Sequence, residues 1–341
     1  MSEMTNHPRS ILVVESLPFG RALASLPAIR ALRLAYPKTL IVTAATRGII
    51  ELLTIGNLVD EAIDLGVIHS SNQGLLGAAG RSARLFGQAR KENFEMVLDF
   101  SPGPETQVIS RIVLGAKTVT PLSVSHFVDR LLGRSRTPRA GDHRAECASV
   151  LDQLGISIDD REPPIGPSAE DNDKFEQLLA RNKSRGGEPI AVLHGAIGDE
   201  RRGWPAERFG EIASMLSNNL GARIVAADEP HRRAFTGAVS SLLPKGSIKL
   251  AAPRAIELLA AIARASILIT DEPGIADAAA DFGTPVLEVA EASMVTGRNE
   301  SSQSKNHRVI DGASRARISA DEVYELAAEM IQENRSSMLF R

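Results

Sequence analysis

This sequence has a single cysteine, no long apolar run and no strong net charge of either sign. Its 341 residues include a single cysteine, Cys147, so the chain forms no intrachain disulfide and no metal site built from several cysteines. We expect Cys147, which lies in a helical pattern, to be a buried and inert thiol. No apolar run approaches the ~18 residues that a membrane span needs. The polar start, MSEMTNHPRS, lacks the apolar core of a signal peptide, and we expect a cytoplasmic protein.

The charge balance argues against nucleic acid as the main partner. The net charge of -3 gives no electrostatic attraction to a polyanion. Basic residues gather only modestly, over 130–144. Such a cluster is typical of a solvated loop, and contact with an anionic acceptor is the alternative. The GxGxxG pattern is missing too, which leaves a nicotinamide-type dinucleotide site unsupported.

What the sequence does contain is a succession of short apolar runs and helical patterns, typical of an α/β protein with parallel sheets. The predicted strands lie at 11–14, 40–43, 62–65, 96–99, 190–193, 223–226 and 267–270, with another apolar run from 286. The predicted helices lie at 22–35, 171–182, 205–216 and 255–264, and from about 320 to the end. Pro27 must start a new helix or kink the first one. Ser319 and Glu322 form a capping box for the last helix.

The length of the chain and one composition shift suggest two domains. A chain of 341 residues can bury two separate cores. Residues 155–170 are rich in proline, glycine and acid, which is typical of a linker. We expect an N-terminal domain at 1–160, a second domain of similar architecture at 171–318, and a C-terminal helix at 319–341 that could pack back toward the N-terminal domain.

The stretch 267–286, ILITDEPGIADAAADFGTPV, is the most informative candidate site. A strand ends in Asp271 and Glu272, and Pro273 and Gly274 then open a helix of small residues. In open α/β sheets ligands bind beyond the carboxyl ends of the strands, where two carboxylates can meet the hydroxyls or amines of a ligand. The alternative is a solvated turn whose acids stabilise the helix dipole.

A second loop, HGAIGDERRGW at 194–204, also follows a strand. Arg201 or Arg202 could hold a phosphate through two parallel hydrogen bonds, which guanidinium geometry favours. In the alternative the charged run is solvated and Trp204 is a packing residue. His194, at the strand end, is as often a hydrogen-bonded structural group as an acid or base.

The third loop, ESLPFGR at 15–21, joins the first strand to a helix. Backbone amides near Gly20 at a helix N-terminus suit an anion. The alternative is a strand–helix turn with an internal ion pair between Glu15 and Arg21.

Two further residues could face an acceptor. Asp99 ends the strand at 96–99 and could orient an acceptor hydroxyl or cap the next helix. His143 precedes a helix and could line a cleft or lie at the surface.

These loops resemble those of glycosyltransferase family 9, the heptosyltransferases of lipopolysaccharide core assembly. The resemblance extends over nearly the whole chain, and the order and spacing of its segments are specific. The segments are ILVVESLPFGRALASLPAIRALRLAYP, FEMVLDFSPGPETQVISRIVLGAK, HRAECASVLDQLGI, IAVLHGAIGDERRGWPAERFGEIASML and the 267–286 stretch.

The resemblance implies an α/β protein of GT-B architecture, in which two Rossmann-like domains with parallel sheets face each other across a cleft. The N-terminal domain would bind the acceptor, a glycolipid or oligosaccharide of the lipopolysaccharide-core or cell-envelope type. The C-terminal domain would bind a nucleoside-diphosphate sugar, with an ADP-sugar expected first, and no cofactor or metal would be needed. An acceptor hydroxyl would attack the anomeric carbon with inversion, helped by a carboxylate base. The protein would have no transmembrane segment and could sit at the inner membrane face.

The sequence departs from the family where the base is expected. The family's Gly-Asp pair is here Gly20 and Arg21, and its strand-end arginine is here Glu15. An arginine cannot act as a base at physiological pH. The pair therefore looks charge-swapped, and Glu15 is the candidate for a relocated base with Arg21 beside it. Gly20, Asp99 and His143 are the residues predicted on the acceptor side.

The donor turn departs from the family as well. Its Asp, Ser and His are replaced by Glu272, Pro273 and Asp277. The family's Lys before x-Trp-Pro is Arg202, which keeps the charge, and the Ser of its Gly-Ala-Ser turn is Ile197. The predicted donor-binding residues are Gly195, Ala196, Arg202, Trp204, Glu272, Gly274 and Asp277.

Two functions remain open on these residues. One is a glycosyltransferase with a rebuilt active site. The other is a non-catalytic member that acts as a nucleotide-sugar sensor or as a scaffold for another transferase. A two-domain sugar-nucleotide epimerase has the same architecture, but the order of the motifs does not support it.

Overall fold

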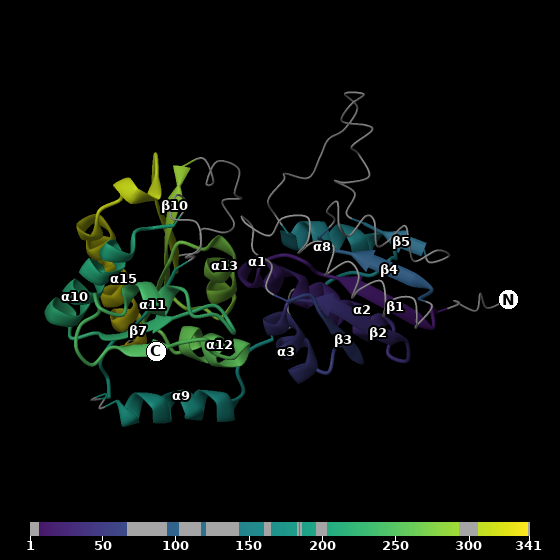
Figure 1. Ribbon diagram of the computed structural model, residues 1–341, viewed down its shortest axis with the longest axis horizontal. Coiled ribbons are helices and arrows are strands. Elements are labelled where there is room, and N and C mark those ends of the chain that lie inside the picture. The colour runs from purple at the N-terminus through teal and green to yellow at the C-terminus, as the bar shows by residue number, and fades with distance from the viewer. Residues whose placement is uncertain are drawn as a thin grey trace. The chain divides into compact units, whose positions relative to one another are not determined.

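The computed structural model divides the chain into two compact units, Met1–Ile165 and Gly166–Arg341 (Figure 1). The division lies inside the segment that the sequence predicts as a linker. The structure describes residues 7–66, 94–101, 117–120, 143–159, 165–182, 184, 186–195, 203–292 and 306–339.

The first unit is built on a parallel sheet in the order β3-β2-β1-β4-β5. Its strands are β1 (Ser10–Val14), β2 (Leu40–Ala45), β3 (Glu61–Asp64), β4 (Met96–Asp99) and β5 (Lys117–Val119). Its described helices are α1 (Phe19–Ala22), a 3-10 turn (Leu23–Ser25), α2 (Leu26–Ala35), α3 (Arg47–Ile55) and α8 (His143–Asp152). Central β1 is buried at every position, which is why it reads as a continuous apolar run instead of alternating.

The second unit repeats this plan with a parallel sheet in the order β11-β10-β9-β6-β7-β8. Its strands are β6 (Ile190–His194), β7 (Arg223–Ala227), β8 (Ile248–Leu250), β9 (Ile267–Thr270), β10 (Val286–Glu291) and β11 (His307–Gly312). Its helices are α9 (Ala169–Arg181), α10 (Ala206–Leu220), α11 (Phe235–Val239), α12 (Ala255–Ala263), α13 (Pro273–Asp281) and α15 (Ala320–Leu339), with a 3-10 turn at Arg315–Arg317.

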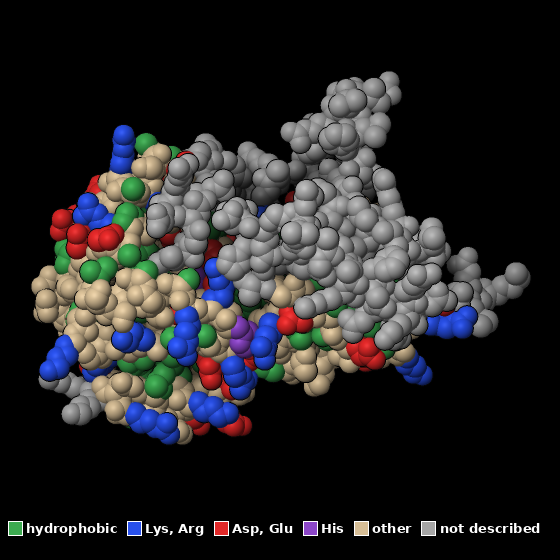
Figure 2. Space-filling model, viewed as in Figure 1, with side chains coloured by type: hydrophobic (Ala, Val, Ile, Leu, Met, Phe, Trp, Pro, Cys, Tyr) green, Lys and Arg blue, Asp and Glu red, His purple; other side chains and the backbone are tan. Residues whose placement is uncertain are grey.

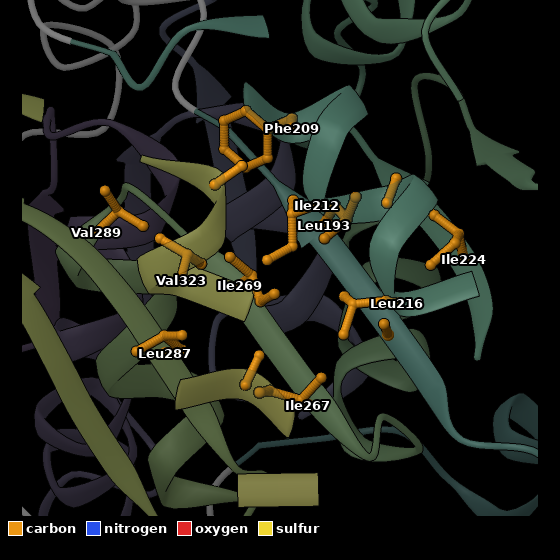
Figure 3. Close-up of a cluster of buried hydrophobic side chains, with 14 of the residues drawn as sticks. Leu193, Phe209, Ile212, Leu216, Ile224, Ile267, Ile269, Leu287, Val289 and Val323 are labelled. Carbon is orange, nitrogen blue, oxygen red and sulfur yellow. The ribbon is translucent and has the colours of Figure 1, made fainter. Parts of the chain in front are cut away.

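The core of the second unit lies between one face of its sheet and the helices α10 and α15. Leu193, Ile269 and Leu287 from three neighbouring strands meet Phe209 of α10 and Val323 of α15 there, as Figure 3 shows. Side chains alternate between the two faces of a strand. His194 and Thr270, which follow core residues directly, therefore point to the opposite face, where α13 packs against β9 and β10.

Helix starts agree with the sequence signals to within a few residues. Pro27 lies in the first turn of α2, so it starts a new helix instead of kinking one. Pro205 was expected at the first helical position but is the N-cap of α10. The predicted capping box of the last helix is present, because Glu322 N–H donates to Ser319 Oγ at 3.3 Å and Ser319 N–H donates to Glu322 Oε2 at 2.8 Å.

The C-terminal helix α15 packs on its own unit. It lies against α10 and against the strands β9 and β10 of the second sheet. Its buried side, made of Val323, Ala327, Met330 and Ile331, belongs to the core described above. The suggestion that this helix also reaches the N-terminal domain stays a prediction.

The described surface shows no segregation of charge on the face drawn in Figure 2, where acidic and basic side chains are interspersed. None of the helices in the described part of the chain is long and apolar enough to cross a membrane.

Candidate functional site

The candidate site of the second unit is the edge at which β6, β7 and β9 end. Parallel strands finish at the same edge, so the residues that follow them come together. β6 ends at His194, β7 is followed by Asp228 and Glu229, and β9 is followed by Asp271 and Glu272. His194, Asp228, Asp271 and Glu272 are all buried. A cluster of buried carboxyl groups around one imidazole therefore occupies the place where α/β folds bind ligands.

Two of these carboxylates hold the local structure. Asp228 Oδ1 accepts the backbone N–H of Thr236 at 3.1 Å, and its Oδ2 accepts the Thr236 hydroxyl. Asp271 Oδ2 accepts the backbone N–H of Trp204 at 2.7 Å. Asp271 therefore fixes the end of the loop after β6 against the turn after β9.

Trp204, predicted to contact the donor, lies in the core instead of on a ligand-binding surface. Its side chain is 2% exposed, and its Nε1–H donates to the carbonyl of Ile318 at 3.0 Å. Its ring meets Phe209 edge to face at 4.8 Å, and Phe209 meets Phe235 in the same way. The structure thus supports the packing interpretation and makes Trp204 an anchor for the loop.

Gly195, the first residue of that loop, has no room for a side chain. A Cβ built there would lie 2.7 Å from two ring atoms of Phe235 and 3.2 Å from Phe209. Because residue 195 is glycine, the backbone directly after β6 packs against the rings of Phe235 and Phe209. This contact fixes the position of the first residue of the loop.

Replacing Gly195 with alanine is expected to lower the free energy of unfolding by about 1–3 kcal/mol, because the added methyl group overpacks the aromatic stack. Urea unfolding would measure the loss. The matched control is Gly237→Ala in α11, where a Cβ would meet nothing within 4 Å. That control should be neutral or stabilising. Equal effects at the two glycines would refute the steric argument.

Glu272 is a carboxyl group that the structure favours in its protonated form. Burial raises its pKa well above the usual value, and the negative charges of Glu229 and Asp271 raise it further. Its side chain is hydrogen-bonded to Glu229, which is itself paired with Arg232 at 2.6 Å. The protonated Glu272 donates to the Glu229 carboxylate. Its other oxygen, Oε2, is buried with no partner in the described part of the chain.

His194 is a neutral imidazole at the same edge. Its side chain is fully buried, and burial lowers its pKa, although the charges of Glu229, Asp271 and Asp228 oppose that shift. Nδ1 lies 3.3 Å from the Thr270 hydroxyl. Nε2 is buried and has no hydrogen-bond partner among the described residues.

The other predicted donor residues are placed differently. Gly274 lies in the first turn of α13, directly after Glu272 and Pro273. Asp277 is exposed on the same helix, unlike the buried carboxyl groups at the strand ends. Ala196 and Arg202 lie outside the described residues, so the phosphate contact predicted for Arg202 stays a prediction.

In the first unit the expected pairing of Glu15 with Arg21 is wrong. Glu15 is fully buried, whereas Arg21 is exposed on α1. The partner of Glu15 is His143, the first residue of α8, whose Nε2 lies 2.7 Å from Glu15 Oε2. Glu15 Oε1 accepts the backbone N–H of Leu17 at 3.0 Å. The Glu15 carboxylate is buried, and the imidazole of His143 compensates its charge there.

His143 is also in contact with two neighbours on its own helix. Cys147 Sγ lies 3.5 Å from Nε2, and Glu146 Oε2 lies 3.3 Å from Nδ1. Burial alone would lower the pKa of His143, but the hydrogen bonds to Cys147, Glu146 and Glu15 and the charge of Glu15 outweigh it and raise the pKa to about 12. His143 is therefore an imidazolium in a buried ion pair.

Glu15, His143 and Cys147 bring one ligand atom each within 4.8 Å, a spacing at which three side chains could hold a metal ion. Burial raises the pKa of Cys147 to about 11, against the opposing effect of His143. A metal would have to displace one proton from the thiol and one from the imidazolium. The protonated ion pair already balances the buried charge of Glu15, so these residues do not fit a metal well.

The other predicted acceptor-side residues lie around the end of β1. Asp99 is buried at the end of β4, in register with Val14 of β1, and it accepts the backbone N–H of Ser101 at 3.2 Å. Gly20 is buried inside the short helix α1. Sequence and structure agree that Asp99 ends its strand and that Glu15 follows the first strand. The structure adds that these strands are neighbours and that His143, also predicted on the acceptor side, contacts Glu15.

Sequence reasoning missed Asp228 and Glu229. A signal was present, because the acids follow a predicted strand just as Asp271 and Glu272 do. The interaction between Glu15 and His143 had no such signal, since 128 residues separate the two partners.

The arrangement of two parallel α/β units in tandem is the GT-B class of fold, and the predicted fold class is confirmed.

Among solved structures, a glycosyltransferase of family 9 from Veillonella parvula superposes with a TM-score of 0.67 at 17% identity, over 95% of this chain and 97% of that one. The Escherichia coli ADP-heptose lipopolysaccharide heptosyltransferase II gives 0.62 at 15% identity, over 96% and 99%. A UDP-N-acetylglucosamine 2-epimerase from Neisseria meningitidis gives 0.56 at 11% identity, over 95% and 91%. No protein-family model and no curated protein matches the sequence. The chain thus has the fold of the family 9 glycosyltransferases.

Proposed function

We propose that this protein is a glycosyltransferase that uses a nucleoside-diphosphate sugar as donor. The transferred sugar is heptose-like, and the acceptor is a cell-envelope glycan or a glycolipid of the lipopolysaccharide-core type. Transfer is inverting and metal-independent, and it takes place in the cytoplasm at the inner membrane face. Similarity of fold to family 9 structures over 95% of the chain supports the class.

The observation that carries the proposal is the state of Glu272. A buried, protonated carboxyl group whose Oε2 has no protein partner in the described residues is costly unless a ligand satisfies it. The unpartnered oxygen of Glu272 accepts a hydrogen bond from a hydroxyl group of the nucleoside-diphosphate sugar. The backbone amides at the start of α13, near Gly274, lie next to Glu272. The two described ends of the loop after β6, Gly195 and Trp204, are held by packing and by a hydrogen bond. We assign the diphosphate to this loop, with Arg202 as the expected cation.

In the proposed reaction an acceptor hydroxyl attacks the anomeric carbon, its proton passes to a carboxylate, and the nucleoside diphosphate leaves. Glu15 is the proposed base, with His143 as the residue that positions it. Asp99, which ends the neighbouring strand, orients the acceptor hydroxyl. Arg21 is exposed, and the partner of the Glu15 carboxylate is His143, so we assign Arg21 to acceptor binding instead of to the base.

The alternative function, a nucleotide-sugar binder that does not catalyse transfer, is favoured by one observation. Both oxygens of the Glu15 carboxylate are occupied, one by the imidazolium of His143 and one by the N–H of Leu17. A base must also lie within hydrogen-bond reach of the proton that it accepts, whereas Glu15 is 0% exposed. The alternative predicts binding of the nucleotide-sugar without release of nucleoside diphosphate.

The variants Glu272→Leu and Glu272→Gln test the proposal. Calorimetry against ADP, UDP, GDP and CDP and their sugars would first identify the donor. Glu272→Leu should then weaken donor binding by about tenfold, the usual effect of one lost hydrogen bond. Glu272→Gln should bind nearly as the wild type, because its amide resembles the neutral carboxyl group. At high pH Glu272 ionises, so donor binding should weaken in the wild type but not in Glu272→Gln.

Turnover separates the two functions. Release of nucleoside diphosphate in the presence of a lipopolysaccharide-core acceptor supports the transferase. Binding without release, even with acceptor, supports the sensor. A wild-type protein that binds none of the nucleotides refutes both.

A further inference from the structure

His194 carries an unexplained polar atom. Its Nε2 is fully buried at the end of β6 and has no partner in the part of the chain that the structure describes. Buried polar groups in native proteins are nearly always hydrogen-bonded, so an unpaired one at a ligand-binding edge points to a ligand. The neighbouring strand β9 ends in register with it, at Thr270.

The contacts of Thr270 determine which nitrogen of His194 carries the proton. Thr270 Oγ1 accepts the backbone N–H of Glu272 at 3.1 Å. Its only other contact among the described residues is His194 Nδ1, at 3.3 Å. We assign the hydroxyl proton to Nδ1, the described acceptor within its reach, which makes Nδ1 the unprotonated nitrogen of the neutral ring. Nε2 then bears the hydrogen and is a donor without an acceptor.

The charges around His194 select the chemistry of the acceptor. Asp228, Glu229 and Asp271 all act on the imidazole, and Arg232, the cation that acts on it among the described residues, is paired with Glu229. An anionic phosphate oxygen would be repelled by these carboxyl groups. An uncharged hydroxyl can accept from His194 Nε2–H and donate to an oxygen such as Glu272 Oε2. The pair of unpartnered atoms, one donor and one acceptor, matches the two functions of a hydroxyl group.

We propose that His194 binds a sugar hydroxyl of the nucleoside-diphosphate sugar by donating a hydrogen bond from Nε2–H, and that it does not contact the diphosphate. The inference rests on the proposed function, since it assigns a residue to that donor site. The hydroxyl belongs either to the ribose or to the transferred sugar, and the two sources are distinguishable.

The test compares His194→Phe and His194→Gln. Phenylalanine keeps a flat ring but has no donor, whereas the amide nitrogen of glutamine can reach the position of Nε2. Calorimetry would use the nucleoside diphosphate that binds the wild type best, its 2′-deoxy and 3′-deoxy forms, and the matching nucleotide-sugar. His194→Phe should weaken binding by about five- to tenfold, and His194→Gln should restore most of the affinity.

The ligands locate the hydroxyl. If the hydroxyl belongs to the ribose, His194→Phe weakens the binding of the nucleoside diphosphate and of the nucleotide-sugar equally. The effect then vanishes with one of the deoxy forms. If it belongs to the transferred sugar, only the nucleotide-sugar is weakened. Either pattern supports the inference, because a merely structural role would not depend on one hydroxyl of the ligand.

The matched control is His307→Gln. His307 is another buried histidine of the same unit, paired with Glu288 at 3.1 Å, and its substitution should leave all ligand affinities unchanged. The inference is overturned if His194→Phe binds every ligand like the wild type. It is also overturned if the loss is the same for all ligands and glutamine does not restore binding. A wild-type protein that binds no nucleotide overturns the proposed function and this assignment together.

Discussion

Replacing Trp204 with alanine is expected to lower the free energy of unfolding by about 3–5 kcal/mol, the range for removing a large aromatic side chain from a core. The indole is 2% exposed and packs edge to face on Phe209. The substitution also removes the hydrogen bond to the carbonyl of Ile318. Urea unfolding followed by far-ultraviolet circular dichroism would measure the loss.

Trp204→Phe separates the packing from the hydrogen bond. It keeps an aromatic ring in the stack but leaves the Ile318 carbonyl without its partner, and we expect a loss of about 1–3 kcal/mol. An alanine variant as stable as the phenylalanine variant would show that the ring contributes little, contrary to its burial.

Replacing His143 with alanine is expected to cost about 3–5 kcal/mol, because it leaves the Glu15 carboxylate buried without a compensating charge. Glu15 is 0% exposed, and its Oε2 lies 2.7 Å from His143 Nε2. The double variant Glu15→Leu with His143→Ala should be more stable than His143→Ala alone, since it removes the uncompensated charge. Glu146→Gln, on the other side of the imidazole, should have a small effect.

The same pair predicts how stability changes with pH. The imidazole titrates near 6.5 in the unfolded chain and at about 12 in the folded protein. A group whose pKa is raised on folding stabilises the protein fully at a pH below its unfolded pKa. That stabilisation is lost as the pH rises toward its folded pKa. The difference in stability between wild type and His143→Ala should therefore be larger at about pH 6 than at about pH 9. If the difference in stability between wild type and His143→Ala grew with pH, His143 would not be an imidazolium in the folded protein.

The sequence predicts the fold well because parallel strands buried on both faces are written as apolar runs. The strands from β6 to β9 show the limit. Residues 190–193, 223–226 and 267–270 were visible, whereas β8, Ile248–Leu250, contains a lysine and is too short to show a pattern. The edge strand β11, His307–Gly312, was missed because it is half polar and contains no continuous apolar run.

The candidate site was predictable only where neighbouring residues in the chain are also neighbours in space. Glu272 and Gly274 lie together because a strand, a turn and a helix follow one another. The ion pair of Glu15 and His143 depends on how α8 packs against the end of β1, which no local pattern encodes. The expected pair of Glu15 and Arg21 failed because a buried carboxylate takes the partner that is buried with it.

Trp204 connects three segments that are distant in the chain, since its backbone binds the turn after β9 and its indole binds the residue that leads into the last helix. It is also the only tryptophan of the protein. Its intrinsic fluorescence therefore reports on one known position, with no background from other indoles. A change in emission on adding a nucleotide would signal movement of this junction, and the protein thus carries a native optical probe next to its candidate donor site.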